Sequence, residues 1–390
     1  MSQLNLEIDS SFTALLLSFS MSQQKGRIIS PRLLALAVVA LALAAILVID
    51  NLKNVLDPVT RDLNRFAKYE IVYSCVGKHV SSVYDVCTIH GDGSGKSEIL
   101  AGETAGSVLD SPSINELGQM IFSCSEMEMV KKHARVKGAI CSRSNIQDKS
   151  LITLETGSVH YSNTDINRSG WVVFQCDSEQ ICLTSITASG ASANPALQLS
   201  HGFEPAINDR GWIAFQCNDP STVKGISTYN ICALQVESKS IQHLTHAPDD
   251  ALYSDPDINE LGLILFACQE PGEAPNICSI RLDDPEQRHL TSVQSPSHNA
   301  KPRVNADGQI VFECWLDEQT SNICGINRDG SQLHQLTSDG SNDFAPSINE
   351  DGVVAYVCGQ NLCVINFDGS GLQQLTTLKQ DGVVSDPEIQ

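Results

Sequence analysis

The feature that most constrains the fold is a segment that recurs six times after residue 69. Each copy runs from an apolar residue through Asn, two residues, Gly and a short apolar stretch with an aromatic residue, and ends at Cys ten residues on. The copies are INELGQMIFSC from Ile114, INRSGWVVFQC from Ile166, INDRGWIAFQC from Ile207, INELGLILFAC from Ile258, VNADGQIVFEC from Val304 and INEDGVVAYVC from Ile348. They start 41 to 52 residues apart, which is the period of a β-propeller blade.

Each repeat is interpreted as four strands, A to D. Strand A ends at the Asn, the N-x-x-G turn leads into strand B, and B ends at the aromatic residue and Cys. Strand C opens with IC, LC or VC, and an Asp-Gly turn leads to a final strand that ends in LT. Asp-Gly between two apolar runs is a hairpin signal, because the tight turn needs residues that tolerate positive φ. A single sheet of this kind cannot bury both faces, so the units are expected to stack around an axis.

The 14 cysteines fall into seven pairs, each joining the end of strand B to the start of strand C. The pairs are Cys75 with Cys87, Cys124 with Cys141, Cys176 with Cys182, Cys217 with Cys232, Cys268 with Cys278, Cys314 with Cys324, and Cys358 with Cys363. Neighbouring antiparallel strands hold facing Cα atoms about 4.5–5.5 Å apart, within disulfide range. Zinc–thiolate sites favour short fixed spacings such as C-x-x-C, whereas these gaps run from 5 to 17 residues. We therefore predict seven disulfides in seven blades.

The first and last units are incomplete. YEIVYSC from Tyr69 has no clean strand A before it, and SDPEIQ (Ser385 to Gln390) is a strand A with no strand B after it. The C-terminal strand is expected to complete the first blade and close the ring, which removes an open sheet edge. The segment DLN (Asp62 to Asn64) is the competing strand A.

The only long apolar run lies near the N-terminus. LLALAVVALALAAILVI spans Leu33 to Ile49 without a charge and follows Lys25, Arg27 and Arg32, so a spanning helix would leave its N-terminus in the cytoplasm. We expect a cytoplasmic segment over 1–32, a transmembrane or signal-anchor helix over 33–50, a linker over 51–68 and the propeller over 69–390. A cleaved signal peptide is the alternative, and Met21 is a competing start. Both interpretations export the propeller, in agreement with its cysteine content.

The net charge and one incomplete motif argue against two classes of function, nucleic-acid binding and nucleotide binding. The net charge of −21 argues against nucleic-acid binding, which needs basic patches. The stretch IHGDGSGKSEIL from Ile89 ends like a phosphate-binding loop, but His90 stands where that motif needs its first Gly. INRDGSQLHQLT from Ile326 and INFDGSGLQQLT from Ile365 share its frame without the lysine. The stretch is therefore a repeated hairpin, and no nucleotide site is expected.

The repeat resembles that of TolB-like β-propellers, in which a sequence close to P-x-W-S-P-D-G is followed by I-A-F, a turn and L-T. The resemblance covers roughly residues 69–390 and implies an all-β propeller. The chain departs from TolB itself in having no preceding α/β domain, seven expected blades instead of six, and a cysteine pair in each blade. Related propellers of prolyl peptidases are followed by a hydrolase domain, but we find no G-x-S-x-G nucleophile motif in this sequence.

Three histidines form one candidate metal site. His160, His201 and His298 each lie six residues before the apolar residue that ends a strand A. Equivalent positions in a propeller lie on a ring, so imidazoles that point inward there could hold a divalent metal. Oligogalacturonate lyases, whose propeller is similar to the TolB type, use a histidine-held metal in such a place. The resemblance implies a metal-dependent polysaccharide lyase as the alternative function.

The A–B turns supply a candidate binding surface at the other mouth of the channel. Its acidic residues are Glu116, Asp209, Glu260, Asp307, Glu350 and Asp351. They could receive a basic partner, although Asp and Asn also simply suit tight turns. We predict an exported, membrane-tethered seven-bladed propeller that acts as a protein-binding scaffold, periplasmic or otherwise extracytoplasmic. No cofactor other than a divalent metal is suggested, and the chain is more readily interpreted as a binding protein than as an enzyme.

Overall fold

The computed structural model describes residues 66–76, 84–99, 108–130, 133–145, 152–157, 161–177, 179–218, 228–338, 340–377 and 384–390. All described residues belong to one compact unit, Asp62–Gln390. The predicted helix over 33–50 lies outside them. In the part of the chain that is described, no helix is long and apolar enough to cross a membrane.

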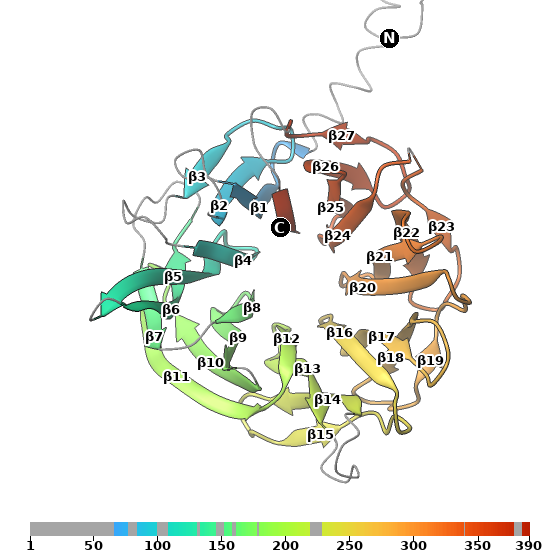
Figure 1. The fold of residues 1–390 in the computed structure, drawn as a ribbon, viewed down its shortest axis with the longest axis horizontal. Coiled ribbons are helices and arrows are strands. Elements are labelled where there is room, and N and C mark those ends of the chain that lie inside the picture. Colours follow the sequence, from blue (N-terminus) through green and yellow to red (C-terminus); the bar gives the residue numbers. More distant parts are fainter. Residues whose placement is uncertain are drawn as a thin grey trace, which may run out of the picture. The chain divides into compact units, whose positions relative to one another are not determined.

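The described strands form four-stranded antiparallel units (Figure 1). The first three units in chain order after the N-terminal one are β4 to β7, β8 to β11 and β12 to β15. Their strands are β4 (Val108–Ile114), β5 (Met120–Val130), β6 (His133–Arg143), β7 (Ile152–Gly157), β8 (Ser162–Ile166), β9 (Trp171–Asp177), β10 (Gln180–Ile186), β11 (Ser192–His201), β12 (Phe203–Ile207), β13 (Trp212–Asn218), β14 (Tyr229–Gln235) and β15 (Ile241–His243).

Three more units follow along the chain. Their strands are β16 (Leu252–Ile258), β17 (Leu263–Gln269), β18 (Asn276–Arg281), β19 (Arg288–His289), β20 (His298–Val304), β21 (Gln309–Trp315), β22 (Ser321–Asn327), β23 (His334–Gln335), β24 (Asp343–Ile348), β25 (Val353–Cys358), β26 (Asn361–Asn366) and β27 (Gln373–Gln374). One parallel pair, Tyr229 with Leu252, joins the β12–β15 and β16–β19 units into a single eight-stranded sheet. Blades two to seven are thus the six units in chain order.

The first blade combines the two ends of the described chain. Its strand order is β28-β1-β2-β3, where β28 (Val384–Ile389) lies beside β1 (Glu70–Val76), and β2 (Tyr84–His90) and β3 (Ser97–Ile99) follow. The pairing of Ile71 with Ile389 and of Cys75 with Val384 fixes the register. β2 and β3 form the hairpin around the Gly-Lys-Ser stretch, in which Gly93 and Gly95 adopt positive φ.

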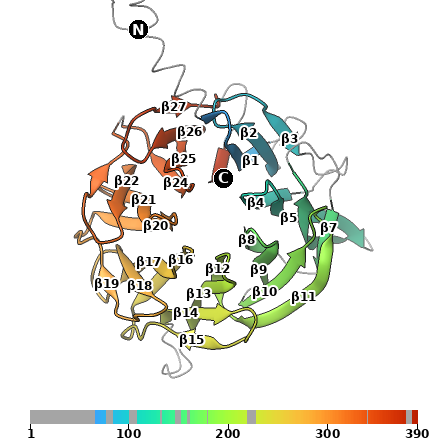
Figure 2. The same cartoon turned by 180° about the vertical axis from the view of Figure 1, so that it is seen from behind.

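The first strand of each blade lines the centre of a ring. Successive inner strands β4, β8, β12, β16, β20, β24 and β28 contact one another in that order, and β28 in turn contacts β4. Figures 1 and 2 show these strands around a central opening, with the short final strands at the periphery. Loops from strand D to strand A therefore meet at one mouth of the channel, and A–B turns meet at the other.

The core lies between neighbouring blades. The recurring aromatic residue of strand B is buried in all six repeats, at Phe122, Phe174, Phe215, Phe266, Phe312 and Tyr356. Phe215, for example, packs with Val173 of the preceding blade and Ile213 of its own. The Thr of the LT motif has a separate role, since Thr245 accepts the N–H of Ile231 and donates its hydroxyl to Asn230. The repeated residues thus encode both the packing between blades and a buried, hydrogen-bonded Thr that follows strand D.

Seven disulfides join the cysteines in the pairs expected from the sequence. Their Cα atoms lie 5.7–5.9 Å apart, slightly farther than directly facing residues would be. The reason is register: Cys232 lies opposite Phe215, and Cys217 lies opposite Asn230. Each bridge therefore runs diagonally across the B–C pair. Disulfides in such number indicate an extracytoplasmic protein.

The third blade keeps its bridge but departs from the regular register. Cys182 of β10 lies opposite Phe174 of β9, as the equivalent cysteine does in the fourth blade. Its partner Cys176 has no directly facing residue, because the pairing with β10 shifts at this point and leaves Cys176 as the extra residue of a bulge. The expectation of directly facing cysteines is therefore wrong in detail in the regular blades and in this one, although the pairing of Cys176 with Cys182 is confirmed.

Candidate functional site

The A–B turn mouth is held together by a belt of buried asparagines. Asn208 accepts the backbone N–H groups of Arg210 and Trp212 at 3.1 and 3.0 Å, which shapes its own turn. Its Nδ2 donates to the carbonyl of Asn259 in the next blade at 3.0 Å. The same donation runs through Asn115, Asn167, Asn208, Asn259, Asn305 and Asn349, and ends at the carbonyl of Gln390. The Asn of the repeat therefore both forms the turn and joins the blades.

Acidic side chains of the same turns accept hydrogen bonds across the blade junctions. Asp209 accepts the N–H of Arg168 at 2.6 Å, and Glu260 accepts that of Asp209 at 2.8 Å. Glu350 accepts the N–H of Ala306 at 2.9 Å. Burial raises the pKa of Glu260 and of Glu350, and neighbouring carboxylates raise both further. These carboxylates stabilise the turns by accepting N–H groups. Accepting a hydrogen bond does not neutralise a carboxylate, so its negative charge stays in place.

Five of the six predicted acidic residues line one hollow of about 290 Å³ at this mouth, namely Glu116, Asp209, Glu260, Glu350 and Asp351. The sixth, Asp307, is exposed on its own turn. Two cations offset part of the charge: Arg168 pairs with Glu116 at 3.2 Å and Lys68 with Asp351 at 2.6 Å. The A–B turns thus bring the predicted surface together as an acidic hollow.

The inner strands carry the same irregularity in every blade. Strand A shifts register against strand B near its middle, and one non-glycine residue there has φ between 45° and 51°. These residues are Ser111, Asn163, Glu204, Asp255, Lys301, Ala345 and Asp386. Bulges of this kind redirect side chains at barrel rims and binding sites. Here they place a left-handed residue beside the channel in each blade.

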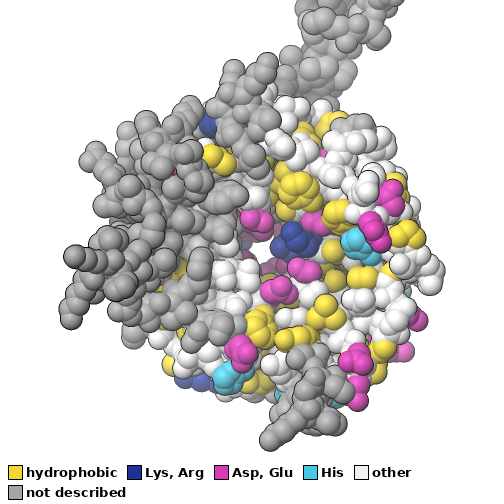
Figure 3. Space-filling view, in the orientation of Figure 1, with side chains coloured by type: hydrophobic (Ala, Val, Ile, Leu, Met, Phe, Trp, Pro, Cys, Tyr) yellow, Lys and Arg dark blue, Asp and Glu magenta, His cyan; other side chains and the backbone are white. Residues whose placement is uncertain are grey.

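A second cavity, of about 400 Å³, lies inside the channel among these bulged strands. Figure 3 shows basic and acidic side chains gathered around the central opening. The cavity wall carries six carboxylates, of Asp165, Glu204, Asp255, Asp257, Asp386 and Glu388, together with Lys301 and Arg303.

Three of these carboxylates stand one residue before the apolar end of strand A and bond to the adjacent blade. Asp165 accepts the N–H of Ile207 at 2.7 Å, and Asp257 accepts that of Val304 at 2.7 Å. Glu388 accepts the hydroxyl of Ser347 at 2.8 Å. The channel wall therefore uses charged groups as links between blades.

Burial in this wall changes the acidity of the carboxyl groups. It raises the pKa of Asp165 to about 6 and that of Glu388 to about 7. The pKa of Asp257 is also raised by burial, although the nearby Arg303 guanidinium opposes the increase. Asp165 and Glu388 can therefore gain or lose protons near neutral pH.

The channel charges were not predicted from the sequence. The corresponding position holds Ser113, Asp165, Ala206, Asp257, Arg303, Ser347 and Glu388 in successive inner strands. Because this column varies, it gives no repeat signal. The one indication of the channel charges in the sequence is a charged residue directly before the apolar residue that ends an inner strand.

The predicted metal ligands occupy different surroundings. His201 ends β11, on the far side of its sheet from the inner strand, and lies 2.9 Å from Gln180 Nε2. His298 begins the inner strand β20 and stacks on Trp315 with ring centroids 5.0 Å apart. His160 lies outside the described residues. Metal binding by the three histidines stays a prediction, which the metal content of the oxidised chain and of its His→Ala variants would test.

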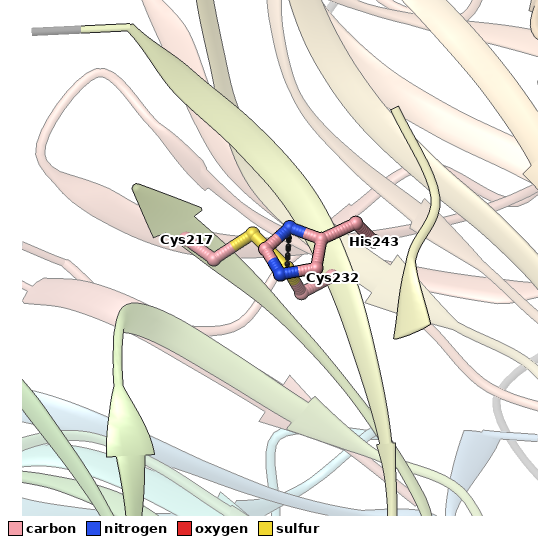
Figure 4. Close-up of side chains that lie close together, drawn as sticks. All are labelled: Cys217, Cys232 and His243. Carbon is pink, nitrogen blue, oxygen red and sulfur yellow. Dashed lines mark hydrogen bonds between the residues drawn. A yellow bond between two sulfur atoms is a disulfide. The ribbon is translucent and has the colours of Figure 1, made fainter. Parts of the chain in front are cut away.

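Two other groups of metal-ligating side chains are close together in the described ranges. They are Cys217, Cys232 and His243, drawn in Figure 4, and Cys268, Cys278 and His289. In both groups the two cysteines form a disulfide. A disulfide sulfur is not a thiolate, so neither group is a metal site in the oxidised chain.

Comparison with solved structures agrees with this architecture. The β-propeller domain of the Trilobed protease from Pyrococcus furiosus is 11% identical, covers 79% of this chain and 94% of that one, and aligns with a TM-score of 0.58. The fold is that of a β-propeller. An oligogalacturonate lyase in complex with manganese is 8% identical, with a TM-score of 0.53 and coverage of 78% and 84%. TolB from Acinetobacter baumannii is 13% identical, with a TM-score of 0.49 and coverage of 83% and 67%.

At these identities the likeness to TolB-like and other propellers is distant and concerns the fold alone. No protein-family model and no curated protein sequence matches the chain.

Proposed function

We propose that this propeller is a protein-binding scaffold outside the cytoplasm, anchored through its N-terminal apolar segment, and that its A–B turn mouth receives a basic partner. The observation that carries the proposal is the convergence of five carboxylates on one hollow at that mouth. A surface of one sign attracts and orients a partner of the opposite sign. The partner expected here carries Lys or Arg side chains that enter the hollow.

Exposed leucines beside the acidic hollow support a protein partner over a free cation. Leu117 and Leu261 occupy the same position of two A–B turns and are 58% and 42% exposed. Large apolar side chains next to a charged depression are typical of a surface that a protein covers. Scaffolds of this kind place binding residues on loops that a rigid fold positions.

Site-specific photo-cross-linking in cells of the native host tests the proposal. A photoreactive amino acid replaces Leu117 or Leu261 in the full chain, and replaces Leu333 or Leu372, which are exposed near the short outer strands, in matched controls. We expect the same adduct from both turn positions and none from the controls. Its yield should fall in the Glu116→Gln, Glu260→Gln, Glu350→Gln variant, because three charges are removed while the amides that replace the Glu260 and Glu350 carboxylates can still accept the backbone N–H groups.

Equal adducts at all four positions would contradict the proposal. So would an adduct whose yield is unchanged by the loss of the three charges, since the acidic hollow would then play no part in binding.

A further inference from the structure

In two neighbouring blades an imidazole lies against the disulfide. His243 in β15 is directly opposite Cys232, and its Nδ1 lies 3.4 Å from that residue's Sγ (Figure 4). His289 in β19 is directly opposite Cys278, and its Nδ1 lies 3.5 Å from Cys278 Sγ and 3.9 Å from Cys268 Sγ. The two groups have the same construction at the same register of adjacent blades.

Other blades hold different side chains at this register. Gln335 lies opposite Cys324, Gln374 opposite Cys363 and Glu98 opposite Cys87. Glutamine therefore suits the position structurally, and histidine in blades four and five adds a ligand that the fold of the blade does not need.

The sulfur atoms are buried, while the imidazoles are at the surface. Cys217, Cys232, Cys268 and Cys278 are at most 4% exposed, whereas His243 and His289 are exposed. An ion would therefore approach from the side of the imidazole, and the surrounding blade would hold the sulfurs in place.

We propose that these two groups are latent metal sites, which form when a dithiol reduces the disulfide and which then take zinc or a similar divalent ion. The S–S bond breaks as it takes up two electrons and two protons from the dithiol, which itself becomes a disulfide. When the metal binds, the two cysteine thiols release their protons to water. Two sulfur–metal bonds and one bond from imidazole Nδ1 then form, and water fills the fourth position.

The geometry requires little rearrangement. All three ligand atoms of each group already lie within 4.8 Å of one another. Four-coordinate zinc, with bonds of about 2.3 Å to sulfur and 2.0 Å to nitrogen, places its ligand atoms roughly 3.5–3.8 Å apart. The sulfur–nitrogen distances in blade five have nearly these values. The two sulfurs must separate by less than about 2 Å, which side-chain rotation can supply.

The test uses the full chain reduced by an immobilised dithiol, which is then removed, and Co²⁺ as a spectroscopic probe. We expect the reduced chain to develop thiolate-to-cobalt absorption that saturates at two ions per chain, and the oxidised chain to develop none. His243→Gln and His289→Gln should each remove one ion, or weaken its binding at least about tenfold. The double variant should lose both, and it reproduces the glutamine found in β23 and β27.

Protection of the thiols from alkylation is a second test, which applies even if full reduction unfolds the chain. After limited reduction, Zn²⁺ should protect Cys217, Cys232, Cys268 and Cys278 from alkylation, as read by mass spectrometry, more than the cysteines that face Gln335 and Gln374. Protection spread evenly over all pairs would overturn the proposal. Cobalt or zinc binding that is unchanged in the double variant would overturn it as well. Both readouts are independent of partner binding at the A–B turn mouth.

Discussion

The inner wall and the outer half of the ring are held together by different chemistry. Around the channel, the blades are joined by the hydrogen bonds that the asparagine belt donates and by those that Asp165, Asp257 and Glu388 accept. Toward the periphery each disulfide stays within its own blade and joins strand B to strand C. Covalent bonds therefore strengthen each blade, whereas the cohesion of the ring depends on non-covalent contacts, namely these hydrogen bonds near the axis and the apolar packing between neighbouring blades.

The largest effect is expected where the ring closes. Ile389 is 6% exposed in β28 and packs in the cluster that joins the first and last blades. Ile389→Ala should lower the free energy of unfolding by about 3–5 kcal/mol, because a buried side chain is lost and a cavity remains. Ile241→Ala is the matched control in the outer strand β15, where the side chain is 43% exposed, and should cost less than about 1 kcal/mol. Denaturant unfolding of both variants measures the difference; equal losses would contradict the importance of closure.

A smaller loss is expected from one member of the asparagine belt. Asn208→Ala removes two acceptor bonds within the turn and the donor bond to Asn259. We expect a loss of about 2–3 kcal/mol, because buried backbone groups are left without partners. Arg210→Ala, on the same turn but with an exposed side chain, is the control. Thermal unfolding that does not separate the two variants would show that the belt contributes little.

The charged channel wall should make stability depend on pH. The pKa of Glu388, raised by burial to about 7, means that the folded chain holds a proton that the unfolded chain has released above about pH 4.5. The associated stability is present at low pH and is lost as the pH rises through 7. Glu388→Gln stays neutral, so between pH 5 and 8 its free energy of unfolding should fall by about 2–3 kcal/mol less than that of the wild type. Denaturant unfolding across this range, with Asp307→Asn as control, measures the change; parallel profiles for Glu388→Gln and the wild type would refute it.

Differences among the disulfides in the outer half should be the smallest. The Cys124–Cys141 bridge closes a separation of 17 residues and the Cys358–Cys363 bridge one of 5. If a bridge acts mainly by limiting the conformations of the unfolded chain, removing the bridge of the longer loop should lower the free energy of unfolding by about 1 kcal/mol more than removing that of the shorter loop. Paired Cys→Ala variants of each bridge, compared in denaturant, give this difference. A larger loss for the short loop would assign the stabilisation to native contacts instead.

The sequence predicts the parts of the molecule that repeat. The Asn, aromatic and Cys columns recur because every blade needs the same turn, the same core side chain and the same bridge, as Asn208, Phe215 and Cys217 illustrate. The acidic turn residues follow from the same alignment, since equivalent turns meet at one mouth.

Residues that differ from blade to blade were harder to predict. Asp165 and Glu388 acquire raised pKa values only because they lie together in the channel wall, which no local pattern of residues encodes. His243 and His289 directly precede the LT motif, but their contact with a disulfide depends on the pairing of the outer strand with strand C. Register across three strands is a tertiary property that spacing along the chain does not determine.

The asparagine belt also makes the junctions between blades directional, with a donor on one side and an acceptor on the other. From the third blade to the seventh, each blade presents a side-chain amide to its successor and a backbone carbonyl to its predecessor, so these junctions have the same kind of donor and acceptor. A duplicated blade inserted at any such junction would meet suitable partners on both sides, and both cysteines of its own bridge would lie within the inserted blade. Gene duplication could therefore alter the number of blades in one step, with the fit of the final strand against the first deciding which ring sizes close.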